Sequence, residues 1–515
     1  MGRNTTEVPF FHNAGGINES INPGHTDEQE CLAAYNVYFD VNQNFGSIYK
    51  RVGYERLNST ALNGKIESIY QTSLGGTDYL FAFTTEGTLY SINLDTYVGT
   101  SVQSGLQSGV RAHFASLSAK AYILTQTNGL YYSTDGTTWT AVADANKPNG
   151  KYCTVFRNRL MVANSTTYPN RLWYSADGDG TDWTDTSPVT YSTGYIDLDT
   201  SDNDYITGLA TIGEQLIVFK QHSIYRVFFT ADTTTVPYQV VPIYGNIGCE
   251  SQESIKQIQI DDQEVLTFIG DTGLYALGVN GNPVDLTAKV KTTYSSIQKS
   301  RLGSCIGLYN PRRKLYHLAY PQGSQFTCSR ELTLSLRPKA WSIWDIRMTA
   351  AITYTDTLQN YIIFGDGDGY LYKHDWRQTN LLADYSDNGT AITSYWQSFY
   401  FDWKLPRRYK QLFSLTTTIA ETPTNCPIST SILAEDSLSV TGTIATVTGV
   451  GSAYDSAVIG TDVFAPDLGY VDYALDTGLY CQTSSIRFEN SNDQQYMAIH
   501  GFSVELKGTK NKKGV

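Results

Sequence analysis

A chain of 515 residues with a net charge of −13 is long enough for two or three domains. It is poorly suited to gripping nucleic acid, because tight non-specific binding to phosphates needs a basic surface. Its 38 Tyr and 43 Gly indicate short strands joined by tight turns, and helix-forming stretches are scarce. The composition therefore indicates an all-β protein and leaves only passage or containment as a role towards DNA.

The seven cysteines are odd in number and widely spread, with no CxxC pair. This pattern predicts buried thiols in a reducing compartment, and it disfavours both a disulfide framework and a zinc site. The N-terminal residues contain no apolar leader, and the chain contains no apolar run of about 18 residues. We therefore expect no secretory signal and no membrane insertion.

Residues 1–60 match no repeat. Short apolar stretches alternate with turn residues over 10–18, 36–40 and 46–54. We expect an extended N-terminal arm over residues 1–60, with one short helix near Glu28–Ala34.

One unit recurs between residues 61 and 385. It consists of an alternating apolar strand, a short turn and a second alternating strand, which usually opens with Gly, then Leu or Ile, then Tyr. Units begin near residues 66, 110, 151, 205, 249, 300 and 349, so they are spaced by about 41 to 54 residues. That is the period of four-stranded propeller blades, and a blade cannot bury both of its faces alone. The repeat predicts a β-propeller of about seven blades over residues 61–385.

Two turns within the repeat carry a further signature. Residues 133–139 resemble the Asp-box of sialidase-like propellers, and residues 175–183 form a looser version. In such a turn the Asp caps backbone N–H groups, the Gly takes a positive φ, and the Trp packs the hairpin on its neighbour. We interpret six residues as structural turn staples without a catalytic role: Asp135, Gly136, Trp139, Asp177, Gly180 and Trp183.

The hairpin repeat stops after about residue 385. Alternating strands without the Gly–aromatic start follow, which predicts a separate β-sandwich over residues 386–515. The predicted strands are Ser394–Asp402, Gln411–Ile419, Ile428–Ala434, Gly442–Thr448 and Phe502–Leu506. Lys507, Lys510, Lys512 and Lys513 predict a short basic tail that is solvated, with a contact to DNA or an acidic neighbour as the alternative.

No catalytic constellation is evident along the chain. The seven histidines are isolated, and there is no HExxH, GxSxG, Walker or post-strand GxGxxG motif. The acidic turn at 365–369 is superficially like a calcium loop, but Arg377 stands where the bidentate Glu would be. A sialidase would need an arginine cluster and a Tyr–Glu pair, and no such arginine motif precedes the first Asp-box. We expect no enzyme activity, no cofactor and no metal.

The order of motifs in the arm and the repeat suggests a family. Residues 13–18, Glu30, residues 36–40 and residues 46–54 resemble the opening of the tail nozzle proteins of short-tailed bacteriophages, also called tail tubular or packaged-DNA stabilisation proteins. Three later stretches are similar to the same family: 217–225, 247–254 and 268–275. The resemblance covers about residues 10–375 and is weaker in the C-terminal domain.

This resemblance implies a structural virion protein that is made in the cytoplasm of the bacterial host. It would form a homo-hexameric ring below the portal and the tail adaptor protein, with tail fibres as possible further partners. The ring would retain packaged double-stranded DNA and pass it during ejection without sequence-specific binding, and the arm would reach into a neighbouring subunit or the adaptor. Two alternatives stay open: a glycan- or receptor-binding propeller of a phage tail, and a sialidase-like glycoside hydrolase. The residues that line the DNA lumen cannot be assigned from the sequence.

Overall fold

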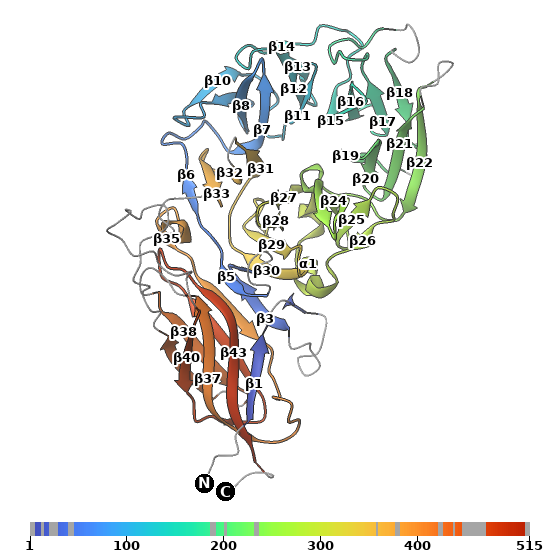
Figure 1. Ribbon diagram of the computed structural model, residues 1–515. Helices are drawn as coiled ribbons and strands as arrows, with labels where there is room; N and C mark the ends of the chain where they lie inside the picture. Colours follow the sequence, from blue (N-terminus) through green and yellow to red (C-terminus); the bar gives the residue numbers. More distant parts are fainter. Residues whose placement is uncertain are drawn as a thin grey trace, which may run out of the picture.

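The computed structural model describes residues 6–11, 15–19, 29–39, 46–185, 192–199, 203–230, 236–356, 359–375, 382–420, 426–435, 438–444 and 470–509. Seven four-stranded antiparallel units follow one another along the chain and are arranged around an axis (Figure 1). Five are separate sheets, and two belong to larger sheets. The predicted all-β fold and the β-propeller are confirmed.

The first five blades are simple meanders in chain order. Their strands are β7 (Ile66–Leu74), β8 (Thr77–Thr84), β9 (Leu89–Ile92) and β10 (Gly99–Gln103); β11 (His113–Leu117), β12 (Lys120–Thr125), β13 (Gly129–Ser133) and β14 (Thr140–Ala141); β15 (Gly150–Phe156), β16 (Arg159–Ser165), β17 (Arg171–Tyr174) and β18 (Gly194–Asp197); β19 (Ile206–Ile212), β20 (Gln215–Lys220), β21 (Ser223–Phe229) and β22 (Tyr238–Gly245); β23 (Lys256–Ile260), β24 (Gln263–Ile269), β25 (Leu274–Gly278) and β26 (Val284–Asp285).

The first strand of each blade lies nearest the axis, because the first strands of most successive blades contact each other. Second strands such as β16 and β20 are buried at every position. Neighbouring blades cover both of their faces, which explains the continuous apolar runs at residues 160–163 and 216–219 in the middle of these two strands. Short helical turns connect the blades: η2 (Gln252–Ser254), η3 (Ala288–Val290), α1 (Lys291–Ser295) and η4 (Lys299–Ser304).

The seventh blade is completed by a strand from the beginning of the chain. Strands β31 (Ala350–Thr355), β32 (Asn360–Gly365) and β33 (Leu371–His374) are followed outward by β6 (Tyr54–Arg56), which pairs antiparallel with β33. The short pair β34 (Ser386–Asp387) and β35 (Thr390–Ala391), preceded by η5 (Ala383–Tyr385), extends the same sheet. Strand β6 therefore closes the ring between residues that lie more than 300 positions apart.

The sixth blade continues into the sandwich. It consists of β27 (Ile306–Asn310), β28 (Leu315–Tyr320), β29 (Arg330–Ser335) and β30 (Ala340–Trp344), and β3 (Glu30–Tyr35) joins β30 in parallel at Tyr35. On its other side β3 pairs with β36 (Ser394–Ser398), and the sheet runs on through β42 (Ser484–Asn490), β38 (Ile428–Ala434) and β39 (Ser439–Ile444). Strand β2 (Gly16–Ile17) also pairs with β3.

The second sheet of the sandwich contains β4 (Val37–Phe39), β5 (Ile48–Lys50), β43 (Ala498–Gly508), β37 (Lys410–Ala420) and β40 (Tyr470–Asp476), with β1 (Thr6–Phe11) on β43 and β41 (Tyr480–Cys481) on β37. The predicted strand Ile428–Ala434 is present as β38 with the same ends, and the predicted strands near 394, 411 and 502 are present with shifted ends. The predicted strand Gly442–Thr448 falls partly outside the described residues, as does the basic tail beyond residue 509.

The described part of the predicted arm does not stand apart from the domains. It supplies β1 to β5 to the sandwich and β6 to the propeller, so its apolar residues pack within their own chain. The helix expected near 28–34 was wrong over its described residues, which form the strand β3 from Glu30. Pairing with β30 and β36 overrides the helix preference of Glu, Leu and Ala in this stretch.

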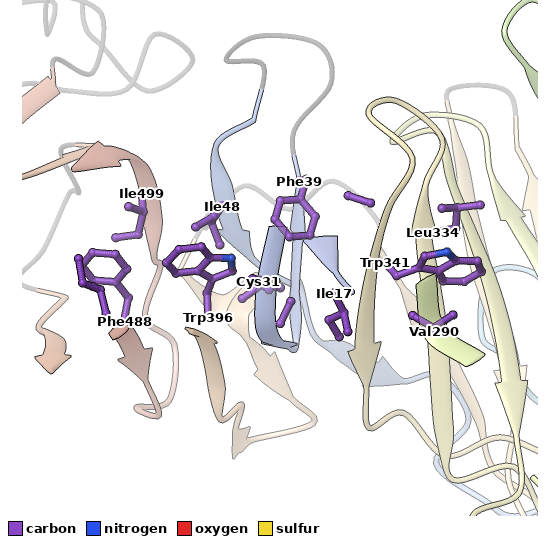
Figure 2. Close-up of a cluster of buried hydrophobic side chains, with 14 of the residues drawn as sticks. Ile17, Cys31, Phe39, Ile48, Val290, Leu334, Trp341, Trp396, Phe488 and Ile499 are labelled. Carbon is purple, nitrogen blue, oxygen red and sulfur yellow. The ribbon is translucent and has the colours of Figure 1, made fainter. Parts of the chain in front are cut away.

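The propeller and the sandwich, the two lobes of the molecule, meet at a contact that we call the joint. One apolar core runs through this joint. Figure 2 shows its side chains in a row from Trp341 in blade 6, through Ile17 and Phe39 of the N-terminal strands, to Trp396 and Phe488 of the sandwich. Trp341 and Trp396 are each 1% exposed, and Phe39 is fully buried. The continuous core and the shared sheet make propeller and sandwich one packed body.

Candidate functional site

The turn at residues 133–139 has the geometry expected of an Asp-box. Asp135 Oδ1 accepts hydrogen bonds from the backbone N–H groups of Thr137 at 2.8 Å and Thr138 at 2.7 Å. These backbone donors hold the pKa of Asp135 well below its ordinary value. Gly136 has a φ of +72°, and Trp139 packs edge-on against Phe81 of the preceding blade with ring centroids 5.3 Å apart. This turn joins blade 2 to blade 1.

In the second box, at residues 175–183, Asp179 caps the turn in place of the expected Asp177. Asp177 accepts a hydrogen bond from the Asn158 side chain at 2.9 Å, while the backbone N–H of Thr181 is capped by Asp179 at 2.9 Å. Gly180 does not have a positive φ; it leaves room for Tyr122, since a Cβ there would lie 2.8 Å from the tyrosine ring. Trp183 is 5% exposed and donates from Nε1 to the Gly180 carbonyl at 3.0 Å.

The motif residues of the N-terminal segment converge on one arginine in the joint. Arg51 is fully buried and donates to the side chains of Asn36 at 2.8 Å, Asp345 at 2.9 Å and Asp387 at 2.6 Å. Burial alone would raise the pKa of Asp345, but the Arg51 guanidinium holds it below the ordinary value. Because Asp345 follows β30 and Asp387 lies in β34, Arg51 connects blades 6 and 7 with the sandwich strands.

A cavity of about 440 Å³ lies on the propeller axis, and we call it the axial cavity. Residues at or just before the first strands of six blades line it, among them Glu67, Arg111, Lys151, Glu253, Ser304 and Thr349. In a propeller these positions converge at one end of the channel, because every blade runs outward from the same axis.

Arg111 and Lys151 provide cationic hydrogen-bond donors in the axial cavity. Arg111 Nη2 donates to the carbonyls of Ser304 and Thr349, each at 3.2 Å, while Nη1 is buried without an acceptor among the described residues. Burial and the neighbouring Arg111 lower the pKa of Lys151. Within the described chain, neither of these two cations forms an ion pair with a carboxylate, whereas Lys65 is paired with Glu67 at 2.6 Å.

Hydrogen-bond acceptors and aromatic rings line the rest of the axial cavity. Burial would raise the pKa of Glu253, but Lys256, Arg111 and His113 together hold it below its usual range, so this carboxylate is charged at neutral pH. Burial lowers the pKa of His113 to about 4, so its ring is neutral there, and it packs edge-on against Tyr152 at 5.0 Å. The cavity therefore offers both cationic donors and anionic acceptors to a small polar molecule.

Sequence reasoning missed Arg111 and Lys151, and it gave Arg51 no structural role although Arg51 lies in the 46–54 motif. A usable signal existed for the first two, since each stands at the start of a repeat unit, where blades meet the axis. The described residues that line the cavity include one arginine, so they do not form the arginine cluster of a sialidase. In the described ranges, no group of three or more His, Cys, Asp or Glu side chains could hold a metal ion.

The acidic turn at 365–369 is held by its own side chain. Asp366 Oδ1 accepts from the backbone N–H groups of Asp368 and Tyr370, both at 2.9 Å. All seven cysteines are buried, as their spacing predicted. No helix within the described residues is long and apolar enough to span a membrane.

Comparison with known proteins identifies no family. No protein-family model matches the chain, and no curated protein matches it. Among solved structures, it is similar to the WD40 β-propeller domain of Doa1, at 8% sequence identity and a TM-score of 0.41, covering 62% of this chain and 96% of that one.

Proposed function

We propose that this protein is a structural subunit of a short-tailed bacteriophage tail, the nozzle through which packaged DNA leaves the capsid. The β-propeller alone is compatible with many binding and assembly roles, so the specific role must rest on other features. The proposal combines the ordered sequence motifs with the place that those motifs occupy in the fold.

The proposal rests on one observation, namely which residues form the joint between propeller and sandwich. The motif residues that resemble the nozzle family include Asn36, Arg51 and Tyr54, and they build the buried contact between propeller and sandwich. In this chain, the stretches that resemble that family therefore hold the propeller and the sandwich together. A subunit of a pressurised conduit needs such rigidity, because its lobes must hold their relative positions under load.

Charge supports the same role. A net charge of −13 disfavours tight contacts with DNA phosphates, which would slow the passage of a genome. In this proposal six copies form a ring beneath the portal and adaptor, with propellers and sandwiches in fixed orientation. The chain itself performs no catalysis.

Electron microscopy and mass measurement of the purified protein test the proposal. We expect closed rings with a mass six times the 57.2 kDa of one chain, and antibody labelling at the portal–tail axis of virions. A protein that stays monomeric at high concentration and is absent from that axis would overturn it.

A further inference from the structure

The axial cavity contains buried hydrogen-bonding capacity that the protein does not use. Arg111 is held in place by the Ser304 and Thr349 carbonyls, and its Nη1 remains buried without an acceptor among the described residues. Leaving a buried donor unpaired is costly, more so for a charged group. A positioned guanidinium with an unused N–H donor is a group that proteins use to bind a carboxylate.

Lys151 provides a second cation towards the same space. It is exposed within the cavity, and Arg111 lies close enough to lower its pKa. No carboxylate in the described chain forms an ion pair with it. The Lys151 ammonium lies over the Tyr152 ring at 5.2 Å from the centroid, and Arg111 interacts with the charge of Glu253. The two cations still repel each other, and an anion placed between them would relieve that repulsion.

The acidic residues in the wall of the axial cavity disfavour a simple anion as its ligand. Glu250 and Glu253 also line the cavity, and a ligand that carried only negative charge would meet their repulsion. A ligand with hydroxyl groups would instead donate hydrogen bonds to them. A neutral sugar would satisfy these carboxylates but would leave Arg111 Nη1 unpaired.

An aromatic ring stands at the rim of the cavity. Phe326 is 71% exposed although the Arg301 guanidinium lies over its ring at 3.5 Å from the centroid. An exposed ring beside polar groups is a surface on which the C–H face of a sugar can lie. The cavity volume of about 440 Å³ falls within the range of small-ligand sites.

We propose that the axial cavity binds an acidic sugar, with its carboxylate on Arg111 and Lys151 and its hydroxyls on Glu250 and Glu253. This binding site is independent of the nozzle role, since it lies inside one propeller and requires no ring. A tail protein with such a site would recognise a uronic or sialic acid residue.

Isothermal titration of the full-length protein with glucuronate, glucose and inorganic phosphate tests the assignment. We expect saturable binding of glucuronate at millimolar concentration or below, with glucose and phosphate each at least about tenfold weaker. Phosphate binding as tightly as glucuronate would overturn the sugar assignment, since it would leave only an anion site. Absence of saturable glucuronate binding would overturn the proposal altogether.

Three variants locate the site. Arg111→Gln and Lys151→Gln should each weaken glucuronate binding by about tenfold or more, through loss of a charge-assisted hydrogen bond. Within the described ranges the Lys151 side chain makes no hydrogen bond, so its variant tests the site even if Arg111→Gln folds poorly. Arg157→Gln removes a cation at the far end of β15 and should bind like the parent protein. Equal affinity in all three variants contradicts the proposal.

Discussion

Arg51 holds both carboxylate oxygens of Asp387, at 2.8 Å from Nη1 and 2.6 Å from Nη2. The two residues are separated by 336 positions in the chain. Their contact joins the N-terminal strands to the sheet of the seventh blade, in the same place where Arg51 also reaches Asp345 of the sixth. A single buried side chain thus connects three parts of the fold: the N-terminal strands, the sixth blade and the seventh blade.

Replacing Arg51 by methionine should destabilise the protein strongly. The substitution keeps most of the side-chain volume but leaves two carboxylates in the joint without their cation, which costs about 3–5 kcal/mol. Urea denaturation followed by tryptophan fluorescence measures this loss. Arg157→Met removes an exposed pair with Glu214 and should cost about 0–1 kcal/mol. Similar losses for the two variants would show that the Arg51 network contributes little.

Asp384→Asn should stabilise the protein at pH 8 but not at pH 4. Burial and the nearby Asp375 raise the pKa of Asp384 to about 7, well above its unfolded value. The folded state therefore favours the protonated form, and the parent protein loses stability as pH rises from about 4 through 7. The amide cannot ionise, so the variant should avoid a loss on the order of 2–4 kcal/mol.

Paired denaturation curves at pH 4, 6 and 8 measure this effect. Lys50, whose pKa burial lowers to about 7, titrates in the same range in both proteins and cancels in the difference. A stability difference between variant and parent that does not change with pH would contradict the assignment of Asp384.

Gly136→Ala should weaken the contact between blades 1 and 2. Gly136 has a φ of +72°, and a Cβ there would lie 2.4 Å from the ring of Tyr79, which also donates to the Asp135 carbonyl at 2.6 Å. Gly105 has a φ of +75° and open space around it, so Gly105→Ala carries only the backbone cost of about 1 kcal/mol. We expect a loss of about 2–4 kcal/mol for Gly136→Ala in thermal unfolding. Equal losses would mean that Tyr79 moves aside freely.

Asn58→Ala should loosen the closure of the propeller. The Asn58 side chain accepts from the Leu371 N–H at 2.7 Å and donates to the Gly369 carbonyl at 3.1 Å, both in blade 7. Its removal leaves the buried Leu371 N–H unpaired, at a cost of about 1–3 kcal/mol, while the Gly369 carbonyl keeps its hydrogen bond from the Leu62 N–H. Hydrogen exchange should then accelerate in β6 and β33 more than in β16. Asn93→Ala, in an exposed turn of blade 1, serves as the control.

The propeller could be predicted because its signals are local. Each hairpin contains its own alternation and turn residues, and the first strands of the seven units begin at residues 66, 113, 150, 206, 256, 306 and 350, close to the predicted starts. The Asp-box at 133–139 is also a local device, and its capping, glycine and tryptophan roles follow from residue type alone.

The joint and the axial cavity could not be predicted in the same way. Strand β3 contains Leu32, Ala33 and Ala34, which favour a helix, and only its partners β30 and β36 make it a strand. Arg51 resembles any other basic residue until Asp345 and Asp387 lie beside it. Arg111 and Lys151 meet because blades 2 and 3 pack side by side, and Glu250 and Glu253 come from the start of blade 5. No sequence window therefore contains both the cations and these acids.

The closure of blade 7 by β6 has a consequence for synthesis of the chain. His374 of β33 donates a hydrogen bond from Nδ1 to the Gly53 carbonyl, 321 residues away. Strand β6 therefore waits until nearly three quarters of the chain has left the ribosome. At about 5–20 residues per second, the delay is roughly 15–60 s. During that time β6 lacks its partner β33, and its open edge is available to other chains. The last blade to form is therefore the step at which nascent copies are most exposed to aggregation.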